Sequence, residues 1–166
     1  GEGLVLARFA GVAAVEQAAA ADELLAAAGL QAQTIEDDES LWAAQRAAQR
    51  SAEGEVVRVS GRPAQLAEVC AAAGVEGATV VGRAALGLSW IALPAAPPGE
   101  LVHAIARLRE VLSPSPCVVL DAPAYVRAHL DPWDQHETAA LVLMRRVKAR
   151  FDPTATCNPG IFAGGI

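Results

Sequence analysis

Residues 55–81, EVVRVSGRPAQLAEVCAAAGVEGATVV, predict a strand, a helix and a second strand in succession. Residues 55–61 predict the first strand, because apolar and polar side chains alternate over residues 57–60, which is typical of a strand with one buried face. Pro63 stands in the first turn of the predicted helix, residues 63–73, where its missing amide is tolerated. Residues 77–81 supply the second strand. This βαβ pattern decides the predicted fold class.

A similar unit precedes it. Residues 4–10 predict a strand, residues 11–29 an alanine-rich helix that stops at Gly29, and residues 33–35 a short strand. Both units carry an Arg followed three residues later by a Gly, and both helices end in Ala-Ala-Ala-Gly. Tandem βαβ units predict an α+β, ferredoxin-like fold: an antiparallel sheet with helices on one face. The alternative is a chance likeness within an alanine-rich chain.

The remaining chain predicts further elements of this sheet. A helix is predicted at 39–48, strands at 88–93 and 116–121, and between them a helix at 101–112 with a regular apolar stripe. The stripe consists of Leu101, Ile105, Leu108 and Leu112. No linker long enough to divide the chain occurs, so we expect a single domain, residues 1–166.

A last helix ends at Phe151, where Asp152-Pro153 stops it. It is predicted to begin near Asp131 or Asp134, and Asp134 with Glu137 has the spacing of a capping box. Its predicted buried stripe consists of Leu143, Val147 and Phe151. Its cations suit the negative end of the helix, and a contact with another domain is the alternative explanation for them.

Composition excludes several classes of protein. The net charge of −6 argues against binding to a phosphate backbone, and 4% aromatic residues do not furnish an RNA-binding sheet. No apolar run is long enough to span a membrane. The three cysteines lack close spacing, which is typical of a reducing compartment, and we expect Cys70 and Cys117 in the core.

The histidines do not form a metal-ligating pattern. His103 is predicted at the surface of a helix, while His129 and His136 stand on either side of a predicted break. We therefore expect no metal site, and no nucleophilic pair between Cys157 and a histidine.

Strand alternation singles out two arginines. Arg58 is opposed to Val57 and Val59, and Arg8 occupies the matching position in the first unit. If the apolar side chains pack under the helices, these arginines emerge on the helix-free face, and Arg83 can join them. Guanidinium groups bind carboxylates bidentately, so this face suits an organic acid. The alternative is that each arginine is solvated or ion-paired within the domain.

The C-terminus predicts a docking tail, residues 151–166. Asn158-Pro159-Gly160 predicts a tight turn in which Gly160 takes a positive φ. The small residues 163–165 can lie close against another surface. We expect this tail to be extended.

The same segment, LMRRVKARFDPTATCNPGIFAGGI at residues 143–166, resembles the C-terminus of FAD-linked oxidases of the vanillyl-alcohol-oxidase type. Within that family it is most similar to the FAD-binding subunits of the bacterial glycolate oxidase kind. The matching residues are Asp152-Pro153, Asn158-Pro159-Gly160 and 164–166. Ile161 departs from the pattern, since the family often has a basic residue there.

The resemblance implies a C-terminal cap domain that covers the flavin and is inactive alone. FAD would be bound mainly by an N-terminal domain, because this chain has no glycine-rich phosphate loop. Asn158 and Gly160 would approach the flavin, and Arg8, Arg58 and Arg83 would face a 2-hydroxy acid. The expected partners are that N-terminal domain and other oxidase subunits, in the cytoplasm or peripheral to the inner membrane. The competing hypothesis is a non-catalytic, ferredoxin-like regulatory module that binds a small ligand.

Overall fold

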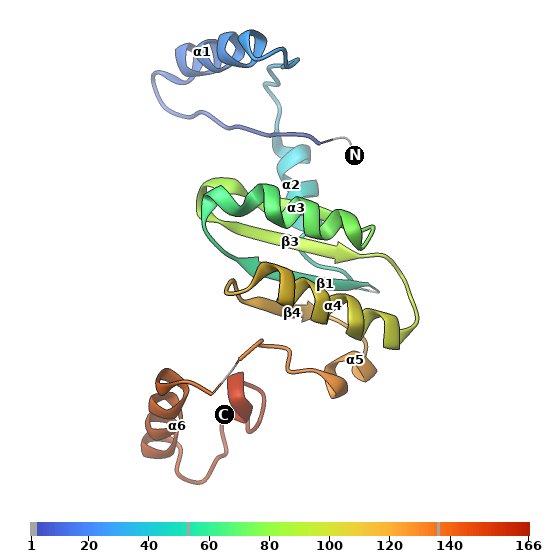
Figure 1. The fold of residues 1–166 in the computed structure, drawn as a ribbon. Coiled ribbons are helices and arrows are strands. Elements are labelled where there is room, and N and C mark those ends of the chain that lie inside the picture. Colours follow the sequence, from blue (N-terminus) through green and yellow to red (C-terminus); the bar gives the residue numbers. More distant parts are fainter. Residues whose placement is uncertain (1–2, 53, 136) are drawn as a thin grey trace. The chain divides into compact units, whose positions relative to one another are not determined.

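The structure is a computed structural model that describes residues 3–52, 54–135 and 137–166. The chain divides into two compact units, residues 1–43 and 44–166. The first contains α1 (Ala14–Ala27) and the start of α2 (Glu39–Ala47), as the sequence predicts. The second contains the sheet and the remaining helices (Figure 1).

The predicted strands at 4–10 and 33–35 are wrong. Both segments are irregular, and Leu4 and Val5 are 80% and 88% exposed. Among residues 3–43 no side chain is buried. A strand needs a partner for its backbone groups and a surface for its apolar face, and neither segment has them. The first βαβ unit therefore does not form.

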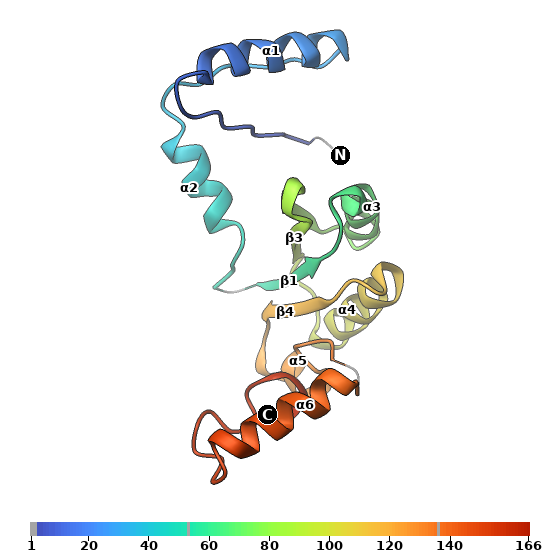
Figure 2. The ribbon, with the colours of Figure 1, turned by 90° about the vertical axis from the view of Figure 1, so that its left-hand side faces the viewer.

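The second unit is built on one four-stranded antiparallel sheet in the order β2-β3-β1-β4. Its strands are β1 (Glu55–Ser60), β2 (Thr79–Arg83), β3 (Leu88–Leu93) and β4 (Cys117–Asp121). The crossover helices α3 (Leu66–Val75) and α4 (Pro98–Leu112) lie on one side of it (Figure 2). These match the predicted elements between residues 55 and 121, so the chain is an α+β protein.

The core lies between the sheet and these two helices. Val57 and Val59 of β1 are at most 1% exposed and pack with Ile91 of β3. The predicted α4 stripe is confirmed, since all four of its residues belong to the same cluster: Leu101, Ile105, Leu108 and Leu112. Cys117 is buried as expected, but Cys70 is exposed, so its predicted place in the core is wrong.

The hairpin between β2 and β3 depends on one glycine. Gly87 has φ of +64°, and a Cβ added there would stand 2.0 Å from the carbonyl oxygen of Gly61. The Gly61 amide in turn donates to the Gly87 carbonyl at 2.9 Å. This close approach joins the end of β1 to the turn that starts β3, and only glycine permits it.

The C-terminal helix begins later than the sequence predicts. After the short α5 (Ala124–His129), which the sequence analysis missed, α6 runs from Ala139 to Phe151. Thr138 is its N-cap, with its hydroxyl accepting from the Leu141 amide at 3.2 Å. The predicted capping box of Asp134 and Glu137 is wrong, because Asp134 accepts from the amide of Cys117 instead.

The predicted buried stripe of α6 is also wrong. Leu143, Val147 and Phe151 are 61%, 50% and 84% exposed, whereas Leu141 is 3% exposed. The tail folds back on the Leu141 side of the helix, so that side is covered and the predicted stripe is left bare. The expectation of an extended tail is corrected by the same finding, since Ala163 near its end is 5% exposed.

Candidate functional site

Arg58 lies on the face of the sheet away from α3 and α4, as the alternation predicts. We call this the second sheet face: Val56, Arg58, Ser60, Thr79, Val81, Arg83, Leu88, Trp90, Ala92 and Val118. In the strand register Arg58 stands between Trp90 of β3 and Val118 of β4. Trp90 and Val118 are each 8% exposed but do not belong to the core cluster under the helices. The half-buried Arg58 therefore has apolar neighbours on both sides.

Arg83 reaches the same tryptophan from the other side. It ends β2, whose register places Val81 opposite Trp90. The guanidinium carbon of Arg83 lies 5.8 Å from the centroid of the Trp90 ring. This is within the range of a cation–π contact, which the exposed Arg83 side chain makes with the buried ring. The structure thus brings together two of the three predicted substrate residues, with Trp90 between their strands.

Neither arginine has an acidic partner among the described residues. Five other arginines form ion pairs there: Arg8, Arg50, Arg107, Arg109 and Arg145. The Arg58 Nε atom is buried and has no hydrogen-bond acceptor within the described chain. Arg58 pairs with neither Glu55 nor Glu76, because Glu76 binds Arg107 at 2.7 Å and one Glu55 carboxyl oxygen has no hydrogen-bond partner among the described residues. Burial raises the pKa of Glu55.

Arg8 has a different environment. It lies in the irregular segment before α1, not on a strand, and its Nε is 3.0 Å from an Asp38 carboxylate oxygen. The same Asp38 oxygen accepts from the Trp42 indole at 2.8 Å. Arg8 is thus a surface ion pair of the first unit, which is the alternative that the sequence analysis left open.

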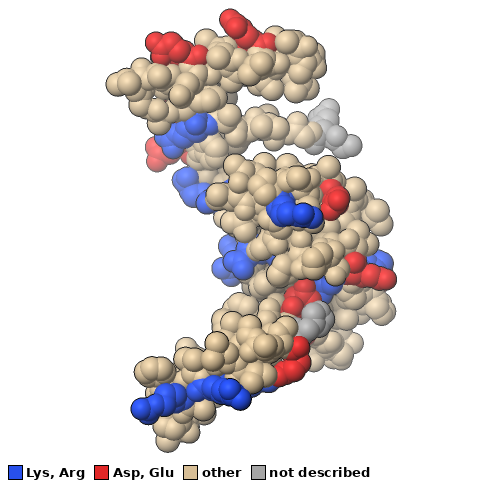
Figure 3. All heavy atoms as spheres, turned by 60° about the vertical axis from the view of Figure 1, so that its left-hand side comes forward, with Lys and Arg blue, Asp and Glu red and all other residues tan. Residues whose placement is uncertain are grey.

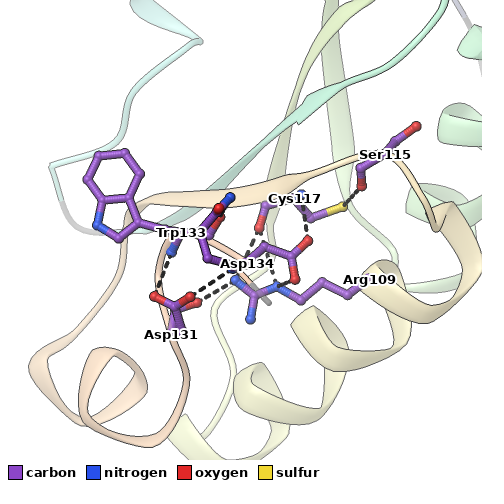
Figure 4. A network of polar contacts seen from close by, with 7 residues as sticks. Arg109, Ser115, Cys117, Asp131, Trp133 and Asp134 are labelled. Atoms are coloured by element: carbon purple, nitrogen blue, oxygen red, sulfur yellow. Dashed lines mark hydrogen bonds and ion pairs between the residues drawn. The ribbon is translucent and has the colours of Figure 1, made fainter. Parts of the chain in front are cut away.

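A second group of contacts holds the loop that leads to α6. Arg109, in the last turn of α4, donates to the carbonyl oxygen of Asp131 at 2.6 Å and to that of Cys117 at 3.2 Å (Figure 4). It also pairs with the Asp134 carboxylate at 3.1 Å. Asp131 in turn accepts from the amide of Trp133 at 3.1 Å. One arginine thus fixes residues 131–135 on the edge strand β4.

From that loop Trp133 contacts the tail. Its indole Nε1 donates to the carbonyl oxygen of Ile161 at 2.9 Å, and its ring lies 5.0 Å from the ring of Phe162. A Cβ added to Gly164 would stand 2.7 Å from Leu141 Cδ2, which shows how closely the tail lies on α6. Residues 131–135 and 137–166 form one folded piece through these contacts, and we call it the C-terminal module.

Asp152 holds the start of the tail. Its carboxylate accepts from the amides of Thr156 and Cys157, each at 2.9 Å, and pairs with Lys148 at 2.7 Å. The Lys148 ammonium also donates to the Cys157 carbonyl. The hydrogen bond from Lys148 is the largest influence on the pKa of Asp152, which is held well below its usual range. The Asp-Pro stop read from the sequence is therefore also an anchor.

The predicted turn at Asn158-Pro159-Gly160 is confirmed. The Ile161 amide donates to the Asn158 carbonyl at 3.3 Å, and Gly160 has φ of +75°. Asn158 itself has φ of +46°. Both residues are exposed, and a Cβ added to Gly160 would meet nothing within 4 Å. The turn thus presents an accessible main chain; contact of Asn158 and Gly160 with a cofactor stays a prediction.

The outer side of α6 carries both apolar and cationic side chains. Leu143, Val147 and Phe151 form an exposed stripe at helical spacing, and Arg146 and Arg150 flank it. Figure 3 shows the Lys and Arg side chains gathered along this helix. Such a stripe is unusual on a surface that faces only water, since it leaves several large apolar side chains in solvent.

The described residues give little evidence for a metal site, a histidine-based site or a membrane span. No cluster of three or more potential metal-ligating side chains is found among its residues. His103 is exposed as predicted, His129 binds the Tyr125 carbonyl one helical turn away, and His136 lies outside the described residues. Within the same residues no helix has the length and apolar character required to cross a membrane.

Residues 133–161 match the family of FAD linked oxidases, C-terminal domain. The matched segment begins at the tryptophan and ends at the isoleucine that the indole hydrogen bond joins. It covers under a fifth of the chain, all of it within the C-terminal module. Neither the curated proteins nor the solved structures include a match to this chain. This segment of the module is thus similar to the C-terminal domain of FAD-linked oxidases.

Three neighbours of the candidate site carry no clear signal in the sequence. Trp90 is predicted in a strand, but its place beside Arg58 is not, because strand register is not legible from one sequence. Trp133 falls within the predicted start of the last helix. Arg109 stands between Leu108 and Leu112 of the α4 stripe, and nothing near it in the sequence indicates the loop that it binds.

Proposed function

We propose that the chain is the C-terminal cap domain of an FAD-dependent 2-hydroxy-acid oxidase or dehydrogenase subunit, similar to glycolate oxidase and inactive alone. The match of residues 133–161 carries the proposal. It gains support because the matched segment has its own closing contact, Trp133 to Ile161, and an exposed turn at Asn158 to Gly160.

We assign a ferredoxin-like fold to residues 55–121. Supporting this are the element order β1-α3-β2-β3-α4-β4 and the strand order β2-β3-β1-β4 with antiparallel neighbours. The two βαβ halves are then 55–83 and 88–121, in place of the units read from the sequence. This arrangement leaves the second sheet face free of crossover helices, where a cap would meet its substrate.

We assign to the described residues the contact with one edge of a flavin, not the binding of a whole FAD. The Asn158–Gly160 turn has an open main chain, but no glycine-rich loop precedes a helix in this chain. FAD, when held by an N-terminal domain, supplies the acceptor for the substrate's hydride. The chain's own part is to place Asn158 and Gly160 beside the cofactor and to exclude water from it.

Substrate orientation falls to the second sheet face. Arg58 has a guanidinium nitrogen without an acceptor, and Arg83 contacts Trp90. Each can bind a carboxylate by a charge-assisted hydrogen bond. Arg8 remains a candidate only if its pair with Asp38 opens.

The N-terminal FAD-binding domain is the proposed partner of α6. The exposed stripe of Leu143, Val147 and Phe151 would be buried there, and Arg146 and Arg150 would meet acidic or phosphate groups at its margin. This gives a function to a helix side that the chain itself leaves bare.

The test is assembly with an FAD-binding domain of this oxidase class, supplied as a separate polypeptide with FAD. We expect the chain alone to bind no FAD by calorimetry. In the assembled pair, an anaerobic 2-hydroxy acid should bleach the flavin. Flavin bound stoichiometrically by the chain alone would overturn the assignment of its role.

A matched pair of variants separates docking from folding. Phe151→Asp should abolish assembly, whereas Val75→Asp on α3 should not, although both side chains are 84% exposed. Equal assembly by the two variants would argue against α6 as the docking helix. If the chain binds small acids but never assembles, the regulatory-module hypothesis gains instead.

A further inference from the structure

The second sheet face holds two cations that no acid of the described chain neutralises. Its strand positions carry Arg58 and Arg83 and no Asp or Glu, apart from Asp121 at the margin. That carboxylate is already occupied by Arg50 at 2.6 Å and by the Ser51 amide at 2.9 Å. The two guanidinium groups make this face locally positive, although the net charge of the chain is −6. A bound anion could pair with them by charge-assisted hydrogen bonds.

The spacing of the two arginines selects among anions. Arg58 is on β1 and Arg83 on β2, and β3 with Trp90 lies between them. Their strand positions are therefore roughly 10 Å apart across the sheet, at about 4.8 Å for each strand. Arg83 is also offset along the sheet, since it pairs with Leu88 while Arg58 pairs with Trp90. One guanidinium group binds one carboxylate through two parallel hydrogen bonds. Two guanidinium groups on either side of the Trp90 indole therefore suit a ligand with two carboxylates.

Trp90 lies between the strand positions of the two arginines. Its ring is 8% exposed and is in cation–π distance of Arg83. The contact favours a position of the exposed Arg83 guanidinium beside the indole, so we treat Trp90 as a positioning residue. On the other side of Trp90, the half-buried Arg58 has an Nε atom that finds no hydrogen-bond acceptor among the described residues.

We infer that the second sheet face binds a small organic dicarboxylate, with one carboxylate at Arg58 and the other at Arg83. Where the proposed function holds, the substrate is then a 2-hydroxy diacid and not glycolate itself. The inference as a binding site does not require flavin, so it can be tested on the chain alone.

The experiment titrates the full chain, at constant ionic strength, with malate, glycolate and inorganic phosphate by NMR of the arginine and tryptophan side-chain N–H groups. We expect malate to bind about tenfold more tightly than glycolate, because a second charge-assisted contact is made. Shifts should concentrate on Arg58, Arg83 and the Trp90 indole. Equal affinity for malate and glycolate, or tightest binding of phosphate, would overturn the dicarboxylate assignment.

Binding by variants provides the second part of the test. Arg58→Gln and Arg83→Gln should each reduce malate binding to the level of glycolate, while Arg127→Gln on α5 is the matched surface control. Trp90→Phe should weaken malate binding and leave glycolate binding at Arg58 unchanged, which loss of folding would not do. Circular dichroism checks the fold of each variant. If Arg127→Gln loses as much malate binding, the effect arises from the change in net charge, and the proposed site is refuted. Failure of assembly with an FAD-binding domain would refute the proposed function and leave this result standing.

Discussion

The Trp133 indole and the Ile161 carbonyl oxygen, 2.9 Å apart, join the two ends of the segment that matches the oxidase family. Between these residues the chain forms α6, the Asp152 anchor and the Asn158–Gly160 turn. Because the contact closes this stretch, the match corresponds to a structural piece and not to an arbitrary string. The turn proposed to face the flavin is therefore positioned by a residue that precedes α6 in the chain.

Trp133→Phe should loosen this closure. The variant keeps a ring against Phe162 but loses the indole donor, so the Ile161 carbonyl loses its hydrogen bond. We expect a loss of about 1 kcal/mol in the free energy of unfolding, and faster proteolysis of the tail. Trp42→Phe, in the first unit, is the control and should leave tail proteolysis unchanged. Unaltered proteolysis in Trp133→Phe would show that other contacts hold the tail.

Gly164→Ala should destabilise the module more than Gly165→Ala. Both glycines have positive φ, +66° and +73°, so both alanines incur a backbone penalty of about 1 kcal/mol. Only at position 164 does the new methyl also meet Leu141, at 2.7 Å, whereas at 165 it meets nothing within 4 Å. Thermal unfolding of the two variants compares them directly. Equal melting temperatures would mean that the tail does not lie on α6.

Leu141→Ala should lower the free energy of unfolding far more than Phe151→Ala does. The sequence alone predicts a large cost for Phe151→Ala, because it places Phe151 in the buried stripe. Leu141 is 3% exposed, and its truncation should cost about 2–5 kcal/mol in free energy of unfolding. Phe151 is 84% exposed, and its truncation should change stability by less than about 0.5 kcal/mol. Urea denaturation of both variants measures the contrast. A large cost for Phe151→Ala would restore the buried stripe read from the sequence.

The sheet could be predicted from the sequence because its elements carry local signals. Alternation predicts β1, and the regular stripe of leucine and isoleucine predicts α4. A proline in the first turn indicates where the α3 region begins. Residues 4–10 also have the local pattern of a strand, but they are irregular and have no partner strand. Pairing is a long-range property, so pattern alone cannot distinguish a paired strand from an apolar segment left in solvent.

The site was predicted in part for the same reason. The face occupied by Arg58 follows from alternation, and the Asn158–Gly160 turn follows from Pro and Gly chemistry. The buried stripe of α6 was predicted wrongly because this helix has apolar residues on more than one side. The pattern alone does not indicate which side the rest of the chain covers. In the structure the tail packs on the side of Leu141.

Thiol labelling should distinguish the three cysteines. Burial, and next the nearby Asp134 carboxylate, raise the pKa of Cys117 to about 12, so almost no thiolate exists at neutral pH. Cys70 and Cys157 are exposed. Two cysteines should therefore react with a maleimide in the native protein, and the third only after unfolding. Rapid native labelling of Cys117 would show that β4 opens readily.

Stability of the C-terminal module should fall in acid through Asp152. Its carboxylate is bound by Lys148 and by two amides, so its pKa in the folded chain lies below the unfolded value of about 4. A group with a depressed pKa stabilises the fold fully above the unfolded value, and that contribution is lost as pH falls from about 5 toward the folded value. Asp152→Asn should remove this contribution to the stability of the module at neutral pH, and the stability should then depend less on pH. The measurement is hydrogen exchange of the Thr156 and Cys157 amides at several pH values, with Asp131→Asn as the control, since Asp131 bonds other amides. If both variants keep the same acid dependence as the natural chain at those two amides, Asp152 is not the titrating anchor.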